Sequence, residues 1–168
     1  MSERQLPLAV RTSVLGGLYL VQGLVYGFGG LVLLPQLAAA GAPLTHQAGV
    51  LALAGVPWVL KLAWAPLLDA RIGRWLGAGR IAAVAMATIA AGLLAIAGID
   101  APTGAVLPIA TAWLVINAAL SLQDVATDAL AFDLLRPAER GRGVSVMLAA
   151  HHLGAEALAG AWIGAVAA

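Results

Sequence analysis

Three carboxylates lie close together near the end of a long apolar stretch of the sequence. Residues 121–135 read S-L-Q-D-V-A-T-D-A-L-A-F-D-L-L, which contains Asp124, Asp128 and Asp133. On a helix, Asp124 and Asp128 share one face about one turn apart, whereas Asp133 lies on the opposite face. Two neighbouring carboxylates couple, and the pair holds one proton more tightly than a single Asp does, as a proton-driven carrier requires.

A carboxylate inside a membrane needs a counter-charge, because each ionised side chain there costs about 2.5–3.5 kcal/mol. Lys61 is the expected counter-charge. It precedes Asp69, which we expect at the cytoplasmic side, by eight residues. That separation is about 12 Å of helix and brings Lys61 to a depth similar to that of Asp124 and Asp128. The placement is compatible with a structural ion pair and equally with a proton-linked or substrate-contacting group.

Other polar residues interrupt the apolar segments and are further candidates for function. Four of them, Gln22, Tyr26, Asn117 and Gln123, are expected to face a cavity or the interior of a helix bundle. His152 and Glu156 form a second pair four residues apart, which fits either a protonation-linked pair or a structural hydrogen bond. A metal site would need three or four ligands, and the sequence around this pair does not supply them, so we expect no metal and no cofactor.

The composition of the chain is that of a membrane protein. Of its 168 residues, 62% are hydrophobic and 10% are charged, and the chain has no Cys. The mean hydropathy is +0.96. Soluble domains have about a quarter of their residues charged. These values favour a chain embedded in the lipid bilayer and give no indication of a nucleic-acid partner.

The apolar residues form five continuous segments, each long enough to cross a membrane. We predict spans at about 12–34, 46–66, 80–99, 105–131 and 144–167, with Pro35 as a breaker after the first of them. The segments show no alternation of polar and apolar residues, and backbone that crosses lipid must be a helix or a closed barrel. The predicted fold is therefore all-α, a polytopic transmembrane helix bundle forming a single domain over residues 1–168.

The basic residues predict the orientation of this bundle. Eight of the nine Lys and Arg side chains precede the first span or lie in the connections after the second and fourth spans, and residues 36–45 and 100–104 contain none. Positive charge gathers on the cytoplasmic side of membrane proteins. We therefore expect a cytoplasmic amino terminus and, after five crossings, a periplasmic carboxy terminus. Asp133, just before Arg136, is expected at the cytoplasmic end of its helix.

Three stretches of the sequence resemble one transporter family. They are Q-G-L-V-Y-G-F from Gln22, P-W-V-L-K-L-A-W-A-P-L-L-D from Pro57, and Q-D-V-A-T-D-A-L-A-F-D-L-L from Gln123, followed by E-R-G-R-G from Glu139. Together they resemble the AmpG-type muropeptide permeases of the major facilitator superfamily, relatives of which are acetyl-CoA transporters. Residues after the second stretch, namely Asp69, Arg71, Gly73 and Arg74, resemble the cytoplasmic loop motif of the superfamily.

The resemblance implies a proton symporter that imports cell-wall fragments across the bacterial inner membrane and has no enzymatic activity. Carriers of this superfamily have two six-helix halves, so five predicted spans correspond to an amino-terminal part, which would need a carboxy-terminal half or another membrane subunit. Two alternatives remain open. One is a small accessory or structural subunit of a membrane complex, and the other is a lipid-linked transferase, which D-x-x-x-D at Asp124 and Asp128 resembles only as a fragment of an Asp-rich motif.

Overall fold

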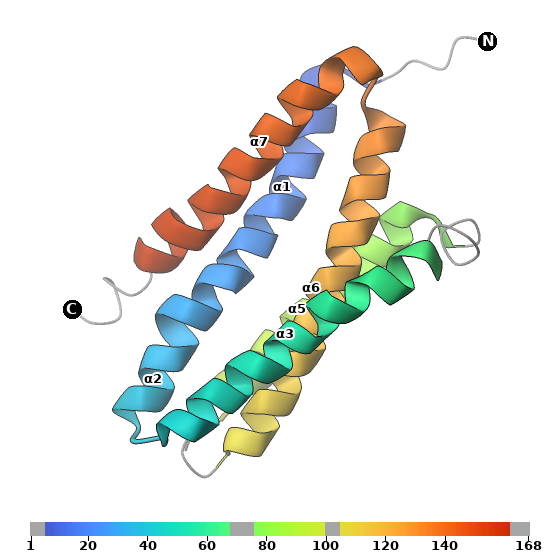
Figure 1. The fold of residues 1–168 in the computed structure, drawn as a ribbon. Coiled ribbons are helices and arrows are strands. Elements are labelled where there is room, and N and C mark those ends of the chain that lie inside the picture. The colour runs from blue at the N-terminus through green and yellow to red at the C-terminus, as the bar shows by residue number, and fades with distance from the viewer. Residues whose placement is uncertain (1–5, 68–75, 100–104, 162–168) are drawn as a thin grey trace. The chain divides into compact units, whose positions relative to one another are not determined.

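The computed structural model describes residues 6–67, 76–99 and 105–161, and every secondary-structure element within them is a helix. The elements in order are α1 (Leu8–Gly27), a π-helical turn (Phe28–Leu33), α2 (Leu34–Ala39), α3 (Leu44–Leu67), α5 (Ala78–Ala97), α6 (Val106–Leu134), a 3₁₀ turn (Pro137–Glu139), α7 (Arg140–His152) and a second π-helical turn (Leu153–Leu158) (Figure 1).

Four helical segments have the length and apolar composition to cross a membrane, namely Leu8–Ala39, Leu44–Pro66, Ala78–Ala97 and Val106–Leu134. The prediction of an all-α chain with membrane-length helices is confirmed to this extent. The fifth expected span begins within α7, and helix continues to residue 161. The remainder of that span lies outside the described residues.

The first helical segment is longer than the sequence predicts. We expected it to end at Pro35, but helix continues from the π-helical turn through α2 to Ala39. Pro35 stands in the first turn of α2, a position where proline is tolerated in helices. The segment ends instead at Gly41, whose φ of +81° belongs to the left-handed region that glycine adopts without strain.

Contacts divide the chain into two compact units. Unit 1 comprises Met1–Val32 and Thr127–Ala168, and unit 2 comprises Leu33–Ala126. Helix α6 contributes its final turns to unit 1 and the rest to unit 2. The expected single domain depends on how the two units fit together and stays a prediction.

In unit 1, α1 lies along α7 and the π-helical turn after it (Figure 1). The core at one end is built by Leu15, Leu135 and Met147, all less than 4% exposed. At the other end glycine brings the backbones together. A Cβ atom on Gly23 would overlap the carbonyl oxygen of His151, and one on Gly154 would overlap that of Leu20. These helices therefore approach as closely as small residues allow in membrane bundles.

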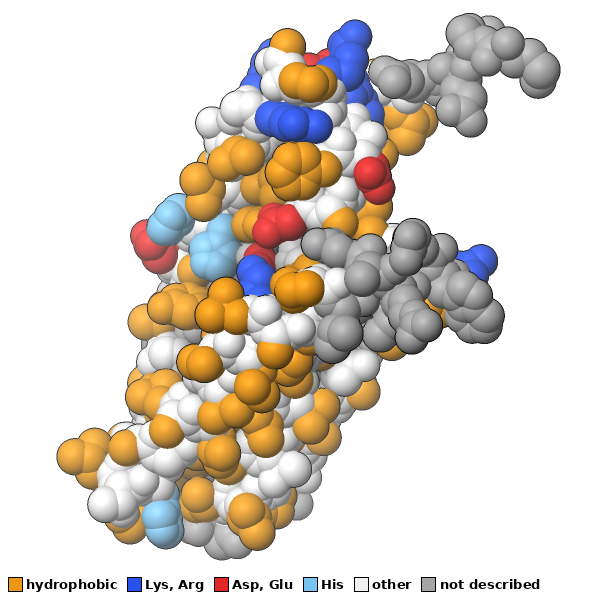
Figure 2. All heavy atoms as spheres, turned by 45° about the vertical axis from the view of Figure 1, so that its right-hand side comes forward, with side chains coloured by type: hydrophobic (Ala, Val, Ile, Leu, Met, Phe, Trp, Pro, Cys, Tyr) orange, Lys and Arg blue, Asp and Glu red, His pale blue; other side chains and the backbone are white. Residues whose placement is uncertain are grey.

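In unit 2, α6 packs against both α3 and α5. Gly92 of α5 faces Ile116 of α6, and a Cβ atom at this glycine would overlap the isoleucine side chain. The outward surface of the unit is apolar, with Leu44, Leu62 and Leu107 each more than three-quarters exposed. Figure 2 shows apolar side chains spread widely over the face it presents. Such exposure is unusual for a monomer in water and suits contact with lipid.

Candidate functional site

Helix α6 carries buried polar side chains along most of its second half. Asn117, Ser121, Gln123, Asp124 and Thr127 are each less than 9% exposed. Asn117, Ser121 and Asp124 recur at helical spacing and therefore lie on one face of α6. Polar groups at this depth of a membrane-length helix need partners, and for these three residues α3 provides them.

The partners in unit 2 come from the P-W-V-L-K stretch of α3. Lys61 Nζ donates to Asp124 Oδ2 and forms an ion pair with it. The two side chains are 28% and 11% exposed, so the pair is largely shielded from the surroundings. One turn earlier in the sequence, Trp58 lies on the same side of α3, with its ring centroid 5.9 Å from Lys61 Nζ. This distance permits a cation–π contact.

Neutral hydrogen bonds extend the same contact between α3 and α6. Trp58 Nε1 donates to Asn117 Oδ1 at 3.3 Å. Asn117 Nδ2 in turn donates to the Trp113 carbonyl oxygen at 2.9 Å. Ser121 Oγ donates to the Pro57 carbonyl oxygen at 3.3 Å. The Lys61–Asp124 ion pair thus lies at the end of a row of polar contacts. Trp58 contacts both the Asn117 amide and the Lys61 ammonium and helps to orient them.

The second carboxylate of α6 has its partner in unit 1. The Tyr19 hydroxyl donates to Asp128 Oδ1 at 2.8 Å, which joins α1 to the final turns of α6. The Tyr19 ring also meets the His151 ring edge-on, with centroids 6.4 Å apart. The Tyr26 ring contacts the same histidine, with centroids 5.9 Å apart, and Tyr26 is 68% exposed. Three titratable side chains of unit 1 therefore lie in a row in space, with Tyr19 between Asp128 and His151.

A third polar cluster lies at the end of unit 1, where α6 ends and α7 begins. Arg11 is 5% exposed, and its Nη1 and Nη2 atoms donate to the two carboxylate oxygens of Glu139 at 2.8 and 3.1 Å. The same guanidinium donates to the carbonyl oxygens of Leu134 at 2.5 Å and Leu6 at 2.9 Å. One buried arginine therefore fixes the start of α1 against the connection between α6 and α7.

Arg136 binds the same carboxylate. Its backbone N–H donates to Glu139 Oε2 at 3.0 Å and its Nη2 to Oε1 at 2.5 Å, closing the 3₁₀ turn. Hydrogen bonds from Arg136 and from Arg11 hold the pKa of the Glu139 carboxyl well below its ordinary value, against the opposing effect of burial. The side-chain hydrogen bond from Arg136 to Glu139 also raises the pKa of Arg136. Figure 2 shows basic side chains gathered at one end of the face it presents.

The structure brings together some of the expected site residues and separates others. Lys61 forms an ion pair with Asp124, and Asp128 accepts a hydrogen bond from Tyr19. His152 Nδ1 lies 3.0 Å from Glu156 Oε1, but these two side chains are 65% and 76% exposed. Gln22 and Gln123 are buried.

The expected loop motif of Asp69, Arg71, Gly73 and Arg74 lies outside the described residues. Across the described ranges, no group of three or more His, Asp and Glu side chains is placed to hold a metal ion.

The cluster around Glu139 was not predicted as a site. In the sequence, Arg11 and Arg136 indicated orientation and Glu139 belonged to a motif, and no pairing among them was expected. Glu139 follows Arg136 by three residues, which is a local signal for their contact, whereas Arg11 is separated from Glu139 by 128 positions. A contact over that distance depends on the packing of α1 and has no mark in the local pattern.

No family model matches the chain, and no solved structure matches it. The polar contacts that α6 makes with α3 in unit 2 and with α1 in unit 1 therefore carry the functional interpretation. The transporter resemblance of the sequence stays a prediction.

Proposed function

We propose that the chain is the amino-terminal part of a proton-coupled secondary transporter. One observation carries the proposal. A helix long and apolar enough to cross a membrane holds two carboxylates one turn apart, Asp124 and Asp128, and each is bonded to a side chain of another helix. Ionisable groups inside a membrane mark substrate and ion pathways, and carboxylates are the usual proton carriers in such pathways.

Asp124 accepts from Lys61 of α3 and Asp128 accepts from Tyr19 of α1, and on these two contacts we propose different parts for the two carboxylates. Protonation of Asp124 neutralises the charge that pairs with Lys61 and so weakens the contact between α3 and α6. Protonation of Asp128 leaves a carbonyl oxygen that still accepts from Tyr19. In the proposal Asp124 therefore couples proton binding to movement of a helix, and Asp128 with Tyr19 passes or holds the proton.

The remaining elements of the proposal come from the sequence resemblance. The substrate is a muropeptide or a similar cell-wall fragment, the location is the bacterial inner membrane, and the amino terminus is cytoplasmic. Rocking about a central site needs a second half, which we assign to a carboxy-terminal half-transporter as partner. Gln22, Asn117 and Gln123, all buried, are the proposed cavity residues, with Tyr26 at the edge. The chain needs no cofactor and performs no catalysis.

Uptake assays test the proposal. Cells express the chain with the carboxy-terminal half of an AmpG-type permease, and uptake of a labelled muropeptide is measured with and without a protonophore. We expect Asp124→Asn to abolish protonophore-sensitive accumulation and Asp128→Asn to reduce it. Asp133→Asn is the matched control, because Asp133 is exposed at the end of α6 and should leave uptake unchanged.

Two results would contradict the proposal. Uptake that is unchanged in both the Asp124 and the Asp128 variants removes their role in proton coupling. A chain that supports no uptake and instead co-purifies in fixed proportion with a membrane protein other than a transporter half favours the accessory-subunit alternative.

A further inference from the structure

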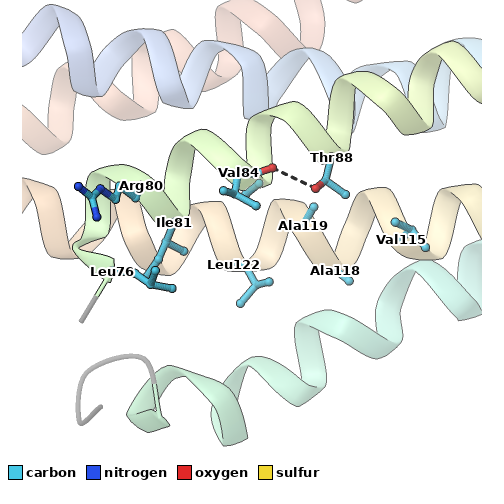
Figure 3. Close-up of a pocket in the computed structure, with 10 residues that line it drawn as sticks. Leu76, Arg80, Ile81, Val84, Thr88, Val115, Ala118, Ala119 and Leu122 are labelled. Atoms are coloured by element: carbon cyan, nitrogen blue, oxygen red, sulfur yellow. Dashed lines mark hydrogen bonds between the residues drawn. The ribbon is translucent and has the colours of Figure 1, made fainter. Parts of the chain in front are cut away.

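Unit 2 has an apolar groove that the proposed transport function does not use. It has a volume of about 440 Å³ and lies along α5 and α6. Figure 3 shows Arg80, Val84 and Thr88 of α5 beside Val115, Ala118 and Leu122 of α6. The groove exists because small side chains form its floor: Ala85 and Ala119 are buried between the helices and leave room above them.

The lining of the groove is apolar except at one end. Thr88 does not make it polar, because the Thr88 hydroxyl donates to the Val84 carbonyl oxygen of its own helix at 3.0 Å. Val84 is 67% exposed and forms one wall. The one charged side chain among the lining residues is Arg80, which is exposed in the first turn of α5. Within the described residues the Arg80 guanidinium has no hydrogen bond or ion pair.

The length of the groove matches one leaflet of a bilayer. From Arg80 to Thr88 is eight residues of helix, about 12 Å, and half of a hydrocarbon core of about 30 Å is about 15 Å. In a membrane that α5 and α6 span, the Arg80 guanidinium at the start of α5 would lie at the level of the lipid headgroups, and Thr88 and Val115 near the middle of the core.

We propose that this groove binds one anionic phospholipid, with an acyl chain along α5 and α6 and the headgroup phosphate at Arg80. The charge decides between occupants: a guanidinium at the mouth of an apolar groove complements a phosphate, and basic pockets between membrane helices are known to bind anionic headgroups. A helix from a second copy would fill the apolar part but leave Arg80 without a partner. The inference needs α5 and α6 to span a membrane and does not depend on transport.

Lipid retention measures this binding. The full chain is reconstituted in nanodiscs of phosphatidylcholine containing phosphatidylglycerol, extracted in mild detergent, and the retained lipid is counted by native mass spectrometry. We expect one retained phosphatidylglycerol in the wild type and roughly fivefold less in Arg80→Gln, the loss expected for one cation near a membrane surface. Arg142→Gln is the control for charge alone, because Arg142 is exposed and lines no part of the groove.

A second pair of variants tests the apolar part. Ala118→Phe fills the groove and should lower retention, whereas Ala87→Phe, on an exposed position of α5 outside the lining, should not. Equal retention in wild type and Arg80→Gln would overturn the proposal, as would equal losses in the Arg80 and Arg142 variants. A dimer whose formation Ala118→Phe abolishes, without retained lipid, would assign the groove to a second copy.

Discussion

Glu139 is the carboxylate most firmly held in the described structure, because both Arg11 and Arg136 bind it. Its folded-state pKa is depressed, so below the ordinary carboxyl value of 4.5 the unfolded chain binds a proton that the folded chain does not. Glu139 therefore contributes its full stabilisation above this value and loses it progressively as the pH falls further. We predict that the thermal midpoint of the purified chain in detergent decreases on acidification below about pH 4.5.

Glu139→Gln tests the source of that pH dependence. The variant should have a lower thermal midpoint at neutral pH, because it leaves the buried Arg11 guanidinium without its counter-charge. It should also flatten the acid-dependent decrease. Glu156→Gln is a matched control, since Glu156 is 76% exposed and pairs with the exposed His152. An acid-dependent decrease that persists in full in Glu139→Gln would show that other groups produce it.

The Lys61–Asp124 pair allows a double-mutant cycle. Lys61→Met leaves the Asp124 carboxylate without its cation, and we predict a loss of about 2 kcal/mol in the free energy of unfolding. The combined variant Lys61→Met with Asp124→Asn removes both charges and should recover most of that loss. The measurement is reversible unfolding of the detergent-solubilised chain. Additive losses in the double variant would mean that the two side chains do not interact.

Local patterns identified the polar residues of α6 but not all of their partners. The spacing of Asp124 and Asp128 placed both on one helical face, and depth in the membrane suggested Lys61. Tyr19 as the partner of Asp128 was not predicted, because an aromatic residue in an apolar span indicates ordinary packing until α1 is placed beside the final turns of α6. The same limit applies to Arg11, whose burial depends on contacts with Leu134 and Glu139 far along the chain.

The packing of α1 against the π-helical turn Leu153–Leu158 depends on glycine. A Cβ atom at Gly23 would overlap backbone atoms of His151 and Ala155, which cannot move aside as a flexible side chain can. We predict that Gly23→Ala destabilises unit 1 by about 1–3 kcal/mol, the usual cost of overpacking. Gly17→Ala is the control on the same helix, because no atom lies within 4 Å of its added Cβ. Equal thermal midpoints for the two variants would contradict this packing.

The helices themselves were largely predictable, because runs of about 20 apolar residues leave few choices for backbone in lipid. The residues at which the helices end were less predictable. Pro35 was expected to stop the first helix, yet the first turn of α2 accommodates it and Gly41 makes the turn. The π-helical turn Phe28–Leu33 had no signal in the sequence beyond its glycines, since hydrogen-bond spacing within a helix is set by packing.

The arrangement of charge along the whole chain predicts how it is inserted. The connection between α6 and α7 holds Arg136, and Arg140 and Arg142 follow in the first turn of α7, whereas the connection before α3, within residues 36–45, holds no Lys or Arg. The positive-inside rule therefore predicts that the first connection is cytoplasmic and the second periplasmic. The chain has no Cys of its own, so single cysteines can report the side of the membrane directly.

We predict opposite labelling of two exposed positions, Ala138→Cys in the first of these connections and Thr45→Cys at the start of α3. In intact spheroplasts a membrane-impermeant maleimide should label Thr45→Cys, and Ala138→Cys should react only after the membrane is permeabilised. The reverse pattern would invert the orientation and place Arg11, Arg136 and Glu139 on the periplasmic side. Labelling of both positions from outside would mean that an even number of crossings separates them. We predict three crossings, one for each of the membrane-length helices α3, α5 and α6 among the described residues between these positions.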